Sequence, residues 1–193
     1  MANGRVCTGF SKPYVAVYTE SAGTVTYSDG QILARGVDVN IEPSTPDENI
    51  FYADNVAAES APGVFTGGSL TLTVDGLLDA AEKLLYGLPS AGTDGLVPYD
   101  DDMAIPYVGV GFIARYQSAG IVTYVPVILT KCRFKEHTVS AKTQEQDIDW
   151  QTEGLTADIL RDDTTKHVWK YVGPGQTTEA LAEAKIKTKF NIT

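Results

Sequence analysis

The clearest signal in the chain is a strict alternation of apolar and polar residues in two separate segments. In residues 37–42 every second residue is a β-branched apolar one, and residues 69–75 repeat the pattern with leucine and valine. A period of two places the apolar side chains on one face of a strand and the polar side chains on the other. The pattern therefore predicts two half-buried strands, each with a core face and a face toward water or a partner.

Other runs rich in β-branched and aromatic residues are also typical of strands. They cover residues 14–18, 24–27, 107–116, 121–134, 148–150, 155–159 and 168–172. The first halves of 107–116 and 121–134 are apolar on both faces, which predicts a central, covered position. Turns are expected at residues 21–23 and at Ser28-Asp29-Gly30, where Asp-Gly is a strong hairpin signal. Roughly eight or more strands predict a mainly β fold.

Two segments have helical rather than strand spacing. Apolar residues of segment 76–86 recur at helical intervals, with Asp75 at the N-cap position and Gly87 as a left-handed stop. Only one stripe of this segment is apolar, so the helix is expected to flank the sheets. Residues 177–190 form a short C-terminal helical segment, with glutamates early and lysines late as the helix dipole favours. Its apolar content is thin, which predicts weak docking.

Two polar segments lack a periodic pattern. Residues 1–12 are expected to form an N-terminal arm, and residues 43–66 a long loop rich in Pro, Asp, Glu and Ala. Loops of this length are uncommon in small domains unless they have a function or are disordered. Ile50, Phe51 and Tyr52 lie in the middle of the loop, which suggests that it finds a surface to bury against. Packing within the subunit and contact with a neighbouring copy both account for the aromatic pair.

Length and composition fit a single domain over residues 1–193 with a sizeable core. Hydrophobic residues make up 43% and charged residues 21% of the 193 positions, which argues against wholesale disorder. The balance of 15 Lys+Arg against 25 Asp+Glu gives a net charge of −10, which argues against a protein that grips nucleic acid by its phosphates.

No apolar stretch approaches the roughly 20 residues that span a bilayer, and the first residues lack the apolar core of a secretory signal. Two cysteines cannot form a disulfide framework or a four-thiolate metal site. An acidic, soluble domain without a membrane partner is expected.

The residues that could carry catalysis are few and scattered. His137 and His167 have no metal-ligand spacing. The Gly-Val-Gly of residues 109–111 lies inside a predicted strand, so a dinucleotide site is not expected. The acidic triplet 100–102, with Asp94 nearby, could ligate calcium, but a solvated acidic loop is the commoner meaning of such a cluster. We therefore expect no catalytic residues, no metal and no cofactor.

Two charged stripes of opposite sign follow each other along the chain. The basic stripe is Lys131, Arg133 and Lys135, and the acidic stripe, also on a single parity, is Glu145, Asp147 and Asp149. Cross-strand pairing on a solvated face is one interpretation. The other is that the acidic stripe faces an aqueous channel shared by copies in an assembly. The sequence alone does not separate the two.

A succession of short motifs occurs in consistent order between about Tyr14 and Tyr171. The most persuasive is Thr-Val-Asp-Gly-Leu-Leu-Asp-Ala-Ala at residues 73–81, which joins a predicted strand to its helix. The others are Gly23-Thr-Val-Thr-Tyr27, Ser28-Asp-Gly30, Phe51-Tyr-Ala-Asp-Asn55, Gly109-Val-Gly-Phe112 and Ile148-Asp-Trp-Gln-Thr152. Together they resemble the major tail proteins of long-tailed bacteriophages with non-contractile tails.

This resemblance implies a tail-tube fold, a β-sandwich or barrel-like pair of sheets with a flanking helix. It implies a structural virion protein rather than an enzyme, assembled in the host cytoplasm and located in the tail. Hexameric rings of such subunits stack into a tube that conducts DNA during genome ejection. The implied partners are further copies of the chain and the tape measure, tail terminator and distal tail proteins, with DNA only as non-specific passing cargo. Strong negative charge suits such a conduit, because a basic lumen would hold the phosphates.

The resemblance also implies two sets of contact residues. Candidate lumen-facing residues come from the polar faces of strands: Asp38, Asn40, Glu42, Thr71, Thr73, Glu145, Asp147 and Asp149. Candidate inter-ring contacts come from the middle of the 43–66 loop: Asn49, Ile50, Phe51, Tyr52, Asp54 and Asn55.

Two other functions explain the same strand count. One is the tube subunit of a contractile injection system, which shares the fold. The other is a monomeric all-β binding module of immunoglobulin or carbohydrate-binding type, which would expose a patch of aromatic residues for its ligand. Light scattering at rising concentration separates an assembling subunit from a monomeric module.

Overall fold

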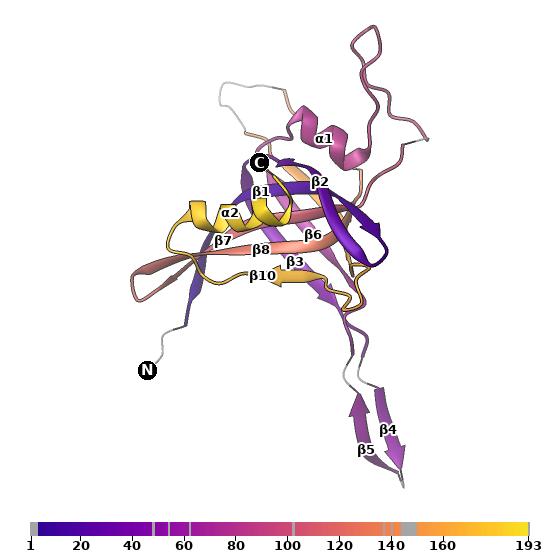
Figure 1. Cartoon of the computed structure of the whole chain (residues 1–193), viewed down its shortest axis with the longest axis vertical. Helices are drawn as coiled ribbons and strands as arrows, with labels where there is room; N and C mark the ends of the chain where they lie inside the picture. Colours follow the sequence, from indigo (N-terminus) through magenta and orange to yellow (C-terminus); the bar gives the residue numbers. More distant parts are fainter. Residues whose placement is uncertain are drawn as a thin grey trace.

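Antiparallel strands and two short helices make up the fold (Figure 1). The computed structural model describes residues 4–47, 49–53, 55–61, 63–101, 103–136, 138–139, 141–143 and 150–192. Within these residues the strands are β1 (Val6–Ser21), β2 (Thr24–Ile32), β3 (Gly36–Ser44), β4 (Asn49–Ala53), β5 (Val56–Ala61), β6 (Gly67–Val74), β7 (Val108–Ser118), β8 (Ile121–Phe134), β9 (Glu153–Leu160) and β10 (Lys170–Val172). The helices are α1 (Asp79–Tyr86) and α2 (Glu179–Lys189).

One large sheet bends over to enclose the core. Its strand order is β2-β1-β7-β8-β9-β6-β3, with β10 paired to β8. Val15 of β1 and Val110 of β7 belong to the same buried cluster as Leu72 of β6 and Leu155 of β9. Strands that are distant in the sheet order therefore meet through their inner faces, as the layers of a sandwich do. The predicted mainly β fold, with a flanking helix and a C-terminal helix, is confirmed.

The central strands β7 and β8 are covered on both faces. Val110 and Phe112 of β7 face the enclosed core. Ile113 of β7 and Ile128 of β8 face the opposite way and pack beneath α2. This confirms the prediction from the two-sided apolar pattern of these segments.

Two glycines of β7 allow α2 to lie directly on the sheet. A β-carbon on Gly109 would lie 2.7 Å from a ring carbon of Phe190, and one on Gly111 would lie 2.6 Å from Cγ2 of Ile186. Ala182, Ile186 and Phe190, spaced four residues apart, are fully buried. The expectation of weak docking is therefore wrong, because three buried side chains suffice where Gly109 and Gly111 let them approach the facing strand closely.

A bulge in β1 brings a lysine to the polar side of α2. The register between β1 and β7 shifts between Ser11 and Tyr14, and Lys12 within the bulge has a φ of 51°. Lys12 Nζ pairs with Glu183 of α2, Tyr14 Oη donates to the same carboxylate at 2.7 Å, and Lys187 Nζ lies 3.1 Å away. These donors, with the hydrogen bond from Lys12 the largest influence, lower the pKa of Glu183 to about 2.

The start of α1 differs from the prediction, whereas its end does not. The helix begins at Asp79 rather than at residue 76, and no side chain caps it. Asp75 accepts a hydrogen bond from the backbone N–H of Arg35 at 3.0 Å instead, which ties the end of β6 to the connection between β2 and β3. Gly87 ends the helix in the left-handed conformation, with a φ of 65°, as predicted.

The Asp-Gly pair at residues 29–30 is not a hairpin turn. The strands β1 and β2 are joined by the turn predicted at residues 21–23, where Ala22 and Gly23 both have positive φ. The register between the strands shifts between Val15 and Val17, and Asp29 has a φ of 52°. A β-bulge and a tight hairpin turn both need a residue in the left-handed conformation. An Asp-Gly dipeptide can therefore form either of them.

Two strand boundaries also differ from the prediction. Residues 6–12 were expected in the N-terminal arm but belong to β1. Their backbone groups pair with β7, which continues to Ser118. The first three residues of the chain lie outside those described. Trp150 precedes β9, belongs to no strand and is 83% exposed, so the strand predicted over 148–150 is wrong at this residue. Residues 148 and 149 lie outside the described part of the chain.

Residues 43–66 contain a hairpin rather than a long loop. β4 and β5 pair antiparallel, and Asn55 at their connection has a φ of 63°. The base is closed by a hydrogen bond of 3.0 Å from the N–H of Thr66 to the carbonyl of Ser44. The hairpin projects far beyond the ends of β3 and β6 (Figure 1). Its β-branched and aromatic residues at 50–52 favour a strand despite the surrounding loop-like composition.

Removing the deepest side chain at the end of α2 should destabilise the whole subunit. We expect Phe190→Ala to lower the free energy of unfolding by about 3–5 kcal/mol, because it leaves a cavity over β7. Leu181→Ala on the same helix, where the side chain is 50% exposed, should cost less than about 1 kcal/mol. Urea unfolding of both variants measures the difference. Equal, small losses would contradict the docking of α2 through its buried side.

The carboxylate of Glu183 should make stability depend on pH in the acid range. Its pKa is about 2 in the folded chain against an ordinary value of 4.5, so the folded state binds this proton less readily than the unfolded state. The stabilisation is complete above about pH 4.5 and is lost as the pH falls towards 2. Glu183→Gln should lower stability at neutral pH and flatten the change between these values. Thermal unfolding at stepped pH tests this, and an unaltered acid profile in the variant would contradict it.

Candidate assembly surface

Three neighbouring strands present a continuous polar surface on the outside of the sheet. In β3 the side chains of Asp38, Asn40 and Glu42 are exposed, while the alternate residues pack toward the core. In β6 Thr71 is exposed and Thr73 half-buried, between fully buried leucines and a valine. The alternation that makes these strands half-buried thus places all five residues on one face.

The register of the strands arranges these residues in rows. Asp38 lies opposite Thr73, and Asn40 lies opposite Thr71. The rows continue onto β9, where Thr71 pairs with Thr156. A third row, from β3 to β8, contains Glu42, Ser69, Asp158 and Arg133. We call the exposed rows of β3, β6 and β9 the polar face.

Five of the eight candidate lumen-facing residues therefore lie together. The remaining three, Glu145, Asp147 and Asp149, lie outside the described residues. Sequence analysis missed Ser69, Thr156 and Asp158, which complete the rows. The alternation of apolar residues in segment 155–159 contained the necessary signal, because the intervening positions must face outward.

Two residues of the basic stripe have acidic partners from later in the chain. Lys135 Nζ lies 2.7 Å from Asp158 of β9, and both side chains are more than half exposed. Lys131 Nζ lies 2.6 Å from Asp163, beyond the end of β9. The predicted pairing with the acidic stripe stays a prediction, because Glu145, Asp147 and Asp149 lie outside the described residues. On the polar face itself, the Asn40 amide donates to Glu42 at 2.8 Å.

Ionisable residues from three parts of the chain meet at Asp163. Its carboxylate accepts hydrogen bonds from Lys131 at 2.6 Å and from Tyr18 at 2.7 Å. The bond from Lys131 is the main influence that lowers the pKa of Asp163, and burial raises the pKa of Tyr18. Both pKa values move away from neutrality, so Asp163 stays ionised and Tyr18 stays neutral at pH 7. Their hydrogen bonds link β1, β8 and the segment after β9.

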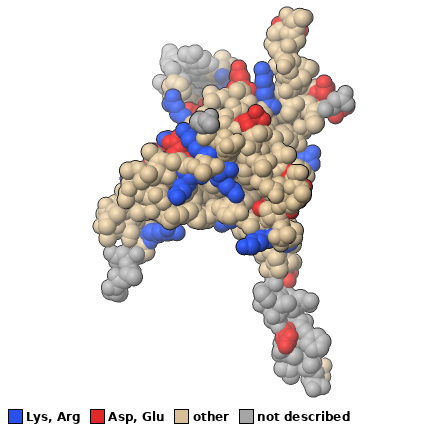
Figure 2. Space-filling model, viewed as in Figure 1, with Lys and Arg blue, Asp and Glu red and all other residues tan. Residues whose placement is uncertain are grey.

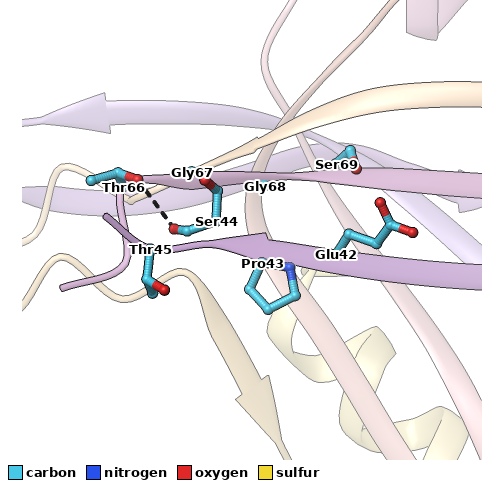
Figure 3. Close-up of a pocket in the computed structure, with 8 residues that line it drawn as sticks. All are labelled: Glu42, Pro43, Ser44, Thr45, Thr66, Gly67, Gly68 and Ser69. Carbon is cyan, nitrogen blue, oxygen red and sulfur yellow. Dashed lines mark hydrogen bonds between the residues drawn. The ribbon is translucent and has the colours of Figure 1, made fainter. Parts of the chain in front are cut away.

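A shallow hollow lies where β3 and β6 run toward the hairpin (Figure 3). Its volume is about 610 Å³, and small or polar residues line it: Glu42, Pro43, Ser44, Thr45, Thr66, Gly67, Gly68 and Ser69. Thr66 Oγ1 donates to the carbonyl of Ser44 at 3.1 Å. Paired glycines at a strand end allow another backbone to approach closely. The hollow offers hydroxyl groups and backbone for hydrogen bonding at the edge of the polar face.

The candidate inter-ring residues lie on the projecting hairpin. Residues 49–52 belong to β4, and Asn55 is exposed at the connection to β5. Asp54 lies outside the described residues. The hairpin brings this set together at a distance from the polar face (Figure 1), so the two predicted contact sets occupy separate surfaces.

Comparison of the sequence with protein-family models and with curated proteins finds no match. No helix within the described residues is long and apolar enough to cross a bilayer. The same residues contain no group of three or more His, Cys, Asp and Glu that could hold a metal ion. His167 is exposed, with Nδ1 3.3 Å from the carbonyl of Asp162, and His137 lies outside the described residues.

A substitution on the polar face should leave the folded subunit intact. Thr71→Val keeps a β-branched side chain on an exposed position of β6, so we expect the free energy of unfolding to change by less than about 0.5 kcal/mol. Leu72→Ala, the next residue and fully buried, should cost about 2–5 kcal/mol. Denaturant unfolding of the two variants checks this. A large loss in Thr71→Val would mean that the polar face packs within the subunit.

Proposed function

We propose that this chain is the major tail-tube subunit of a long-tailed bacteriophage with a non-contractile tail. Copies would join side by side into hexameric rings, and the rings would stack into a conduit for DNA. The resemblance of the motif series supports this proposal. The observation that carries it is the free edge of β3 beside the polar face, described next.

The strand β3 ends the sheet, and β6 is its one paired neighbour among the described strands. It is nine residues long, with a register shift at its start and Pro43 near its end. An exposed edge of this length is a template for pairing with another chain. If copies join at this edge, their bent sheets continue into one another and the backbone groups of β3 gain partners.

Such a junction would turn the polar faces of all copies toward a common axis. The described polar face contains the carboxylates of Asp38, Glu42 and Asp158, with Arg133 and Lys135 at its β8 margin. Carboxylates repel phosphates, and neutral hydroxyl groups add no positive charge that would hold them, so DNA could pass without binding tightly. The projecting hairpin of β4 and β5 is suited to reach an adjacent ring.

The proposed partners follow from this architecture. They are further copies of the chain and the proteins that set the length and ends of a tail, namely the tape measure, tail terminator and distal tail proteins. The proposed location is the tail of the virion. A subunit of a contractile injection tube remains the alternative with the same architecture, and a monomeric binding module remains the alternative without assembly.

Electron microscopy of the purified chain at rising concentration tests the proposal. We expect stacked rings or tubes with a central channel, accompanied by increased light scattering. A chain that stays monomeric at high concentration, with or without purified tail-tip complex as a seed, would contradict the proposal and favour a monomeric binding module.

Shortening the hairpin should separate folding from stacking. Replacing residues 46–62 with a short Gly-Ser linker leaves the base bond from Thr66 to Ser44 in place, and loop length affects stability only weakly. We expect a thermal transition within a few degrees of the native one but no tubes. Tubes of normal length from the shortened chain would show that the hairpin has no role in stacking.

A further inference from the structure

The exposed side of α2 and the neighbouring strand β10 form a second surface with two kinds of chemistry. A hollow of about 640 Å³ lies against Leu181 and Ala184 of α2. A second hollow of about 290 Å³ adjoins it, between α2 and the Tyr171 and Val172 side chains of β10. Leu181 and Val172 are 50% and 54% exposed. Apolar side chains of this size are therefore left open to a partner in both hollows.

Two lysines border both hollows. Lys185 and Lys189 line each of them, and neither has an ion pair with another described residue. Lys189 Nζ lies 4.6 Å from the ring centre of Tyr171, so its ammonium group is held over the second hollow. Figure 2 shows basic side chains gathered over α2, on a chain whose net charge is −10. We call this surface the basic groove.

A loop with the opposite charge projects from another part of the molecule. Residues 88–101, which follow α1, extend away from the sheet (Figure 1). Asp94 and Asp101 are exposed on this loop, and Leu96 is 69% exposed. Figure 2 shows acidic atoms on the same projection. We call this segment the acidic loop.

The acidic loop has a fixed shape in the isolated subunit. The N–H of Gly92 donates to the carbonyl of Leu96 at 2.8 Å, and the N–H of Leu96 donates to Asp94 Oδ1 at 3.1 Å. Tyr99 Oη donates to Glu82 of α1 at 2.6 Å, which anchors the loop to the helix. A preformed loop loses less conformational entropy when it binds. The turn thus presents Leu96 beside the carboxylate of Asp94, and Asp101 follows later on the same loop.

The two surfaces match in charge and in apolar content but cannot meet within one chain, because they lie on different sides of the body (Figure 1). We propose that the basic groove of one copy receives the acidic loop of a second copy. Leu96 would enter a hollow beside α2, and the carboxylates of Asp94 and Asp101 would pair with Lys185 and Lys189. A contact between two different patches of identical chains propagates into a ring or a helical array. The inference rests on the proposed function, because ring assembly is the purpose that the contact would serve.

Charge exchange between the two surfaces tests the contact. Lys185→Glu with Lys189→Glu reverses the groove, and Asp94→Lys with Asp101→Lys reverses the loop. Each double variant alone should need at least about tenfold more protein to self-associate, because like charges then face each other. The quadruple variant should recover the native concentration dependence, as should an equimolar mixture of the two double variants, in which every groove has a complementary loop. Lys83→Glu with Lys166→Glu, two exposed lysines outside the groove, makes net charge more negative by the same amount as the groove variant and is its control.

Light scattering measures self-association, electron microscopy reports rings, and urea unfolding confirms that each variant folds. Loss in the double variants with recovery in the quadruple variant supports the contact. Folded double variants that associate like the control would overturn it and assign the groove to another occupant, while rings in the same samples would leave the proposed function standing. Folded variants that lose association without recovery in the quadruple variant would also overturn it.

Two further outcomes separate the contact from the proposed function. Charge-dependent association without rings would support the contact and contradict the tube. A native chain that never self-associates would overturn both.

Discussion

The antiparallel pair of β7 and β8, buried on both faces, is the constraint on which the rest of the structure depends. One face of the pair closes the core with β6 and β9, and the other carries α2. The covered stretch of this pair leaves little room for outward polar side chains, so most of the polar face lies on the flanking strands β3, β6 and β9, with Arg133 of β8 at its margin. On the covered side of α2, the carboxylate of Glu183 has Lys12, Tyr14 and Lys187 as partners.

An open sheet that bends over its core has two ends, and here they differ. At one end β2 lies beside the C-terminal segment, because Ile192 packs against Gly30 and Phe190 lies 4.9 Å from the ring centre of Tyr27. At the other end β3 is hydrogen-bonded to β6 alone among the described strands, although Phe10 of β1 packs against Gly36 at its start. Its second backbone edge therefore lacks a strand partner there, and such an edge is a template for pairing with another chain. The proposed contact between copies would supply that partner.

Local patterns predicted most elements, and they failed where a contact between distant residues decides the structure. Alternation in β3 and β6 identified five residues of the polar face, because period two depends only on the strand itself. The same reasoning missed Asp158, since its place beside Glu42 and Arg133 depends on which strand lies next to β6. The docking of α2 depends on the absence of side chains at Gly109 and Gly111. The apolar pattern of α2 alone does not predict this docking, because the fit depends on glycines in the facing strand.

If the chain assembles as proposed, three contact surfaces hold its copies together. The free edge of β3, the projecting hairpin and the basic groove lie on separate parts of the chain, and a net charge of −10 makes free copies repel each other. One contact alone therefore holds two copies weakly. Once a ring or a seed positions several copies, each new subunit meets more than one surface at a high effective concentration, and the contacts act together. Assembly then starts slowly and continues readily, because the first contact bears the full entropic cost of association and the later ones do not.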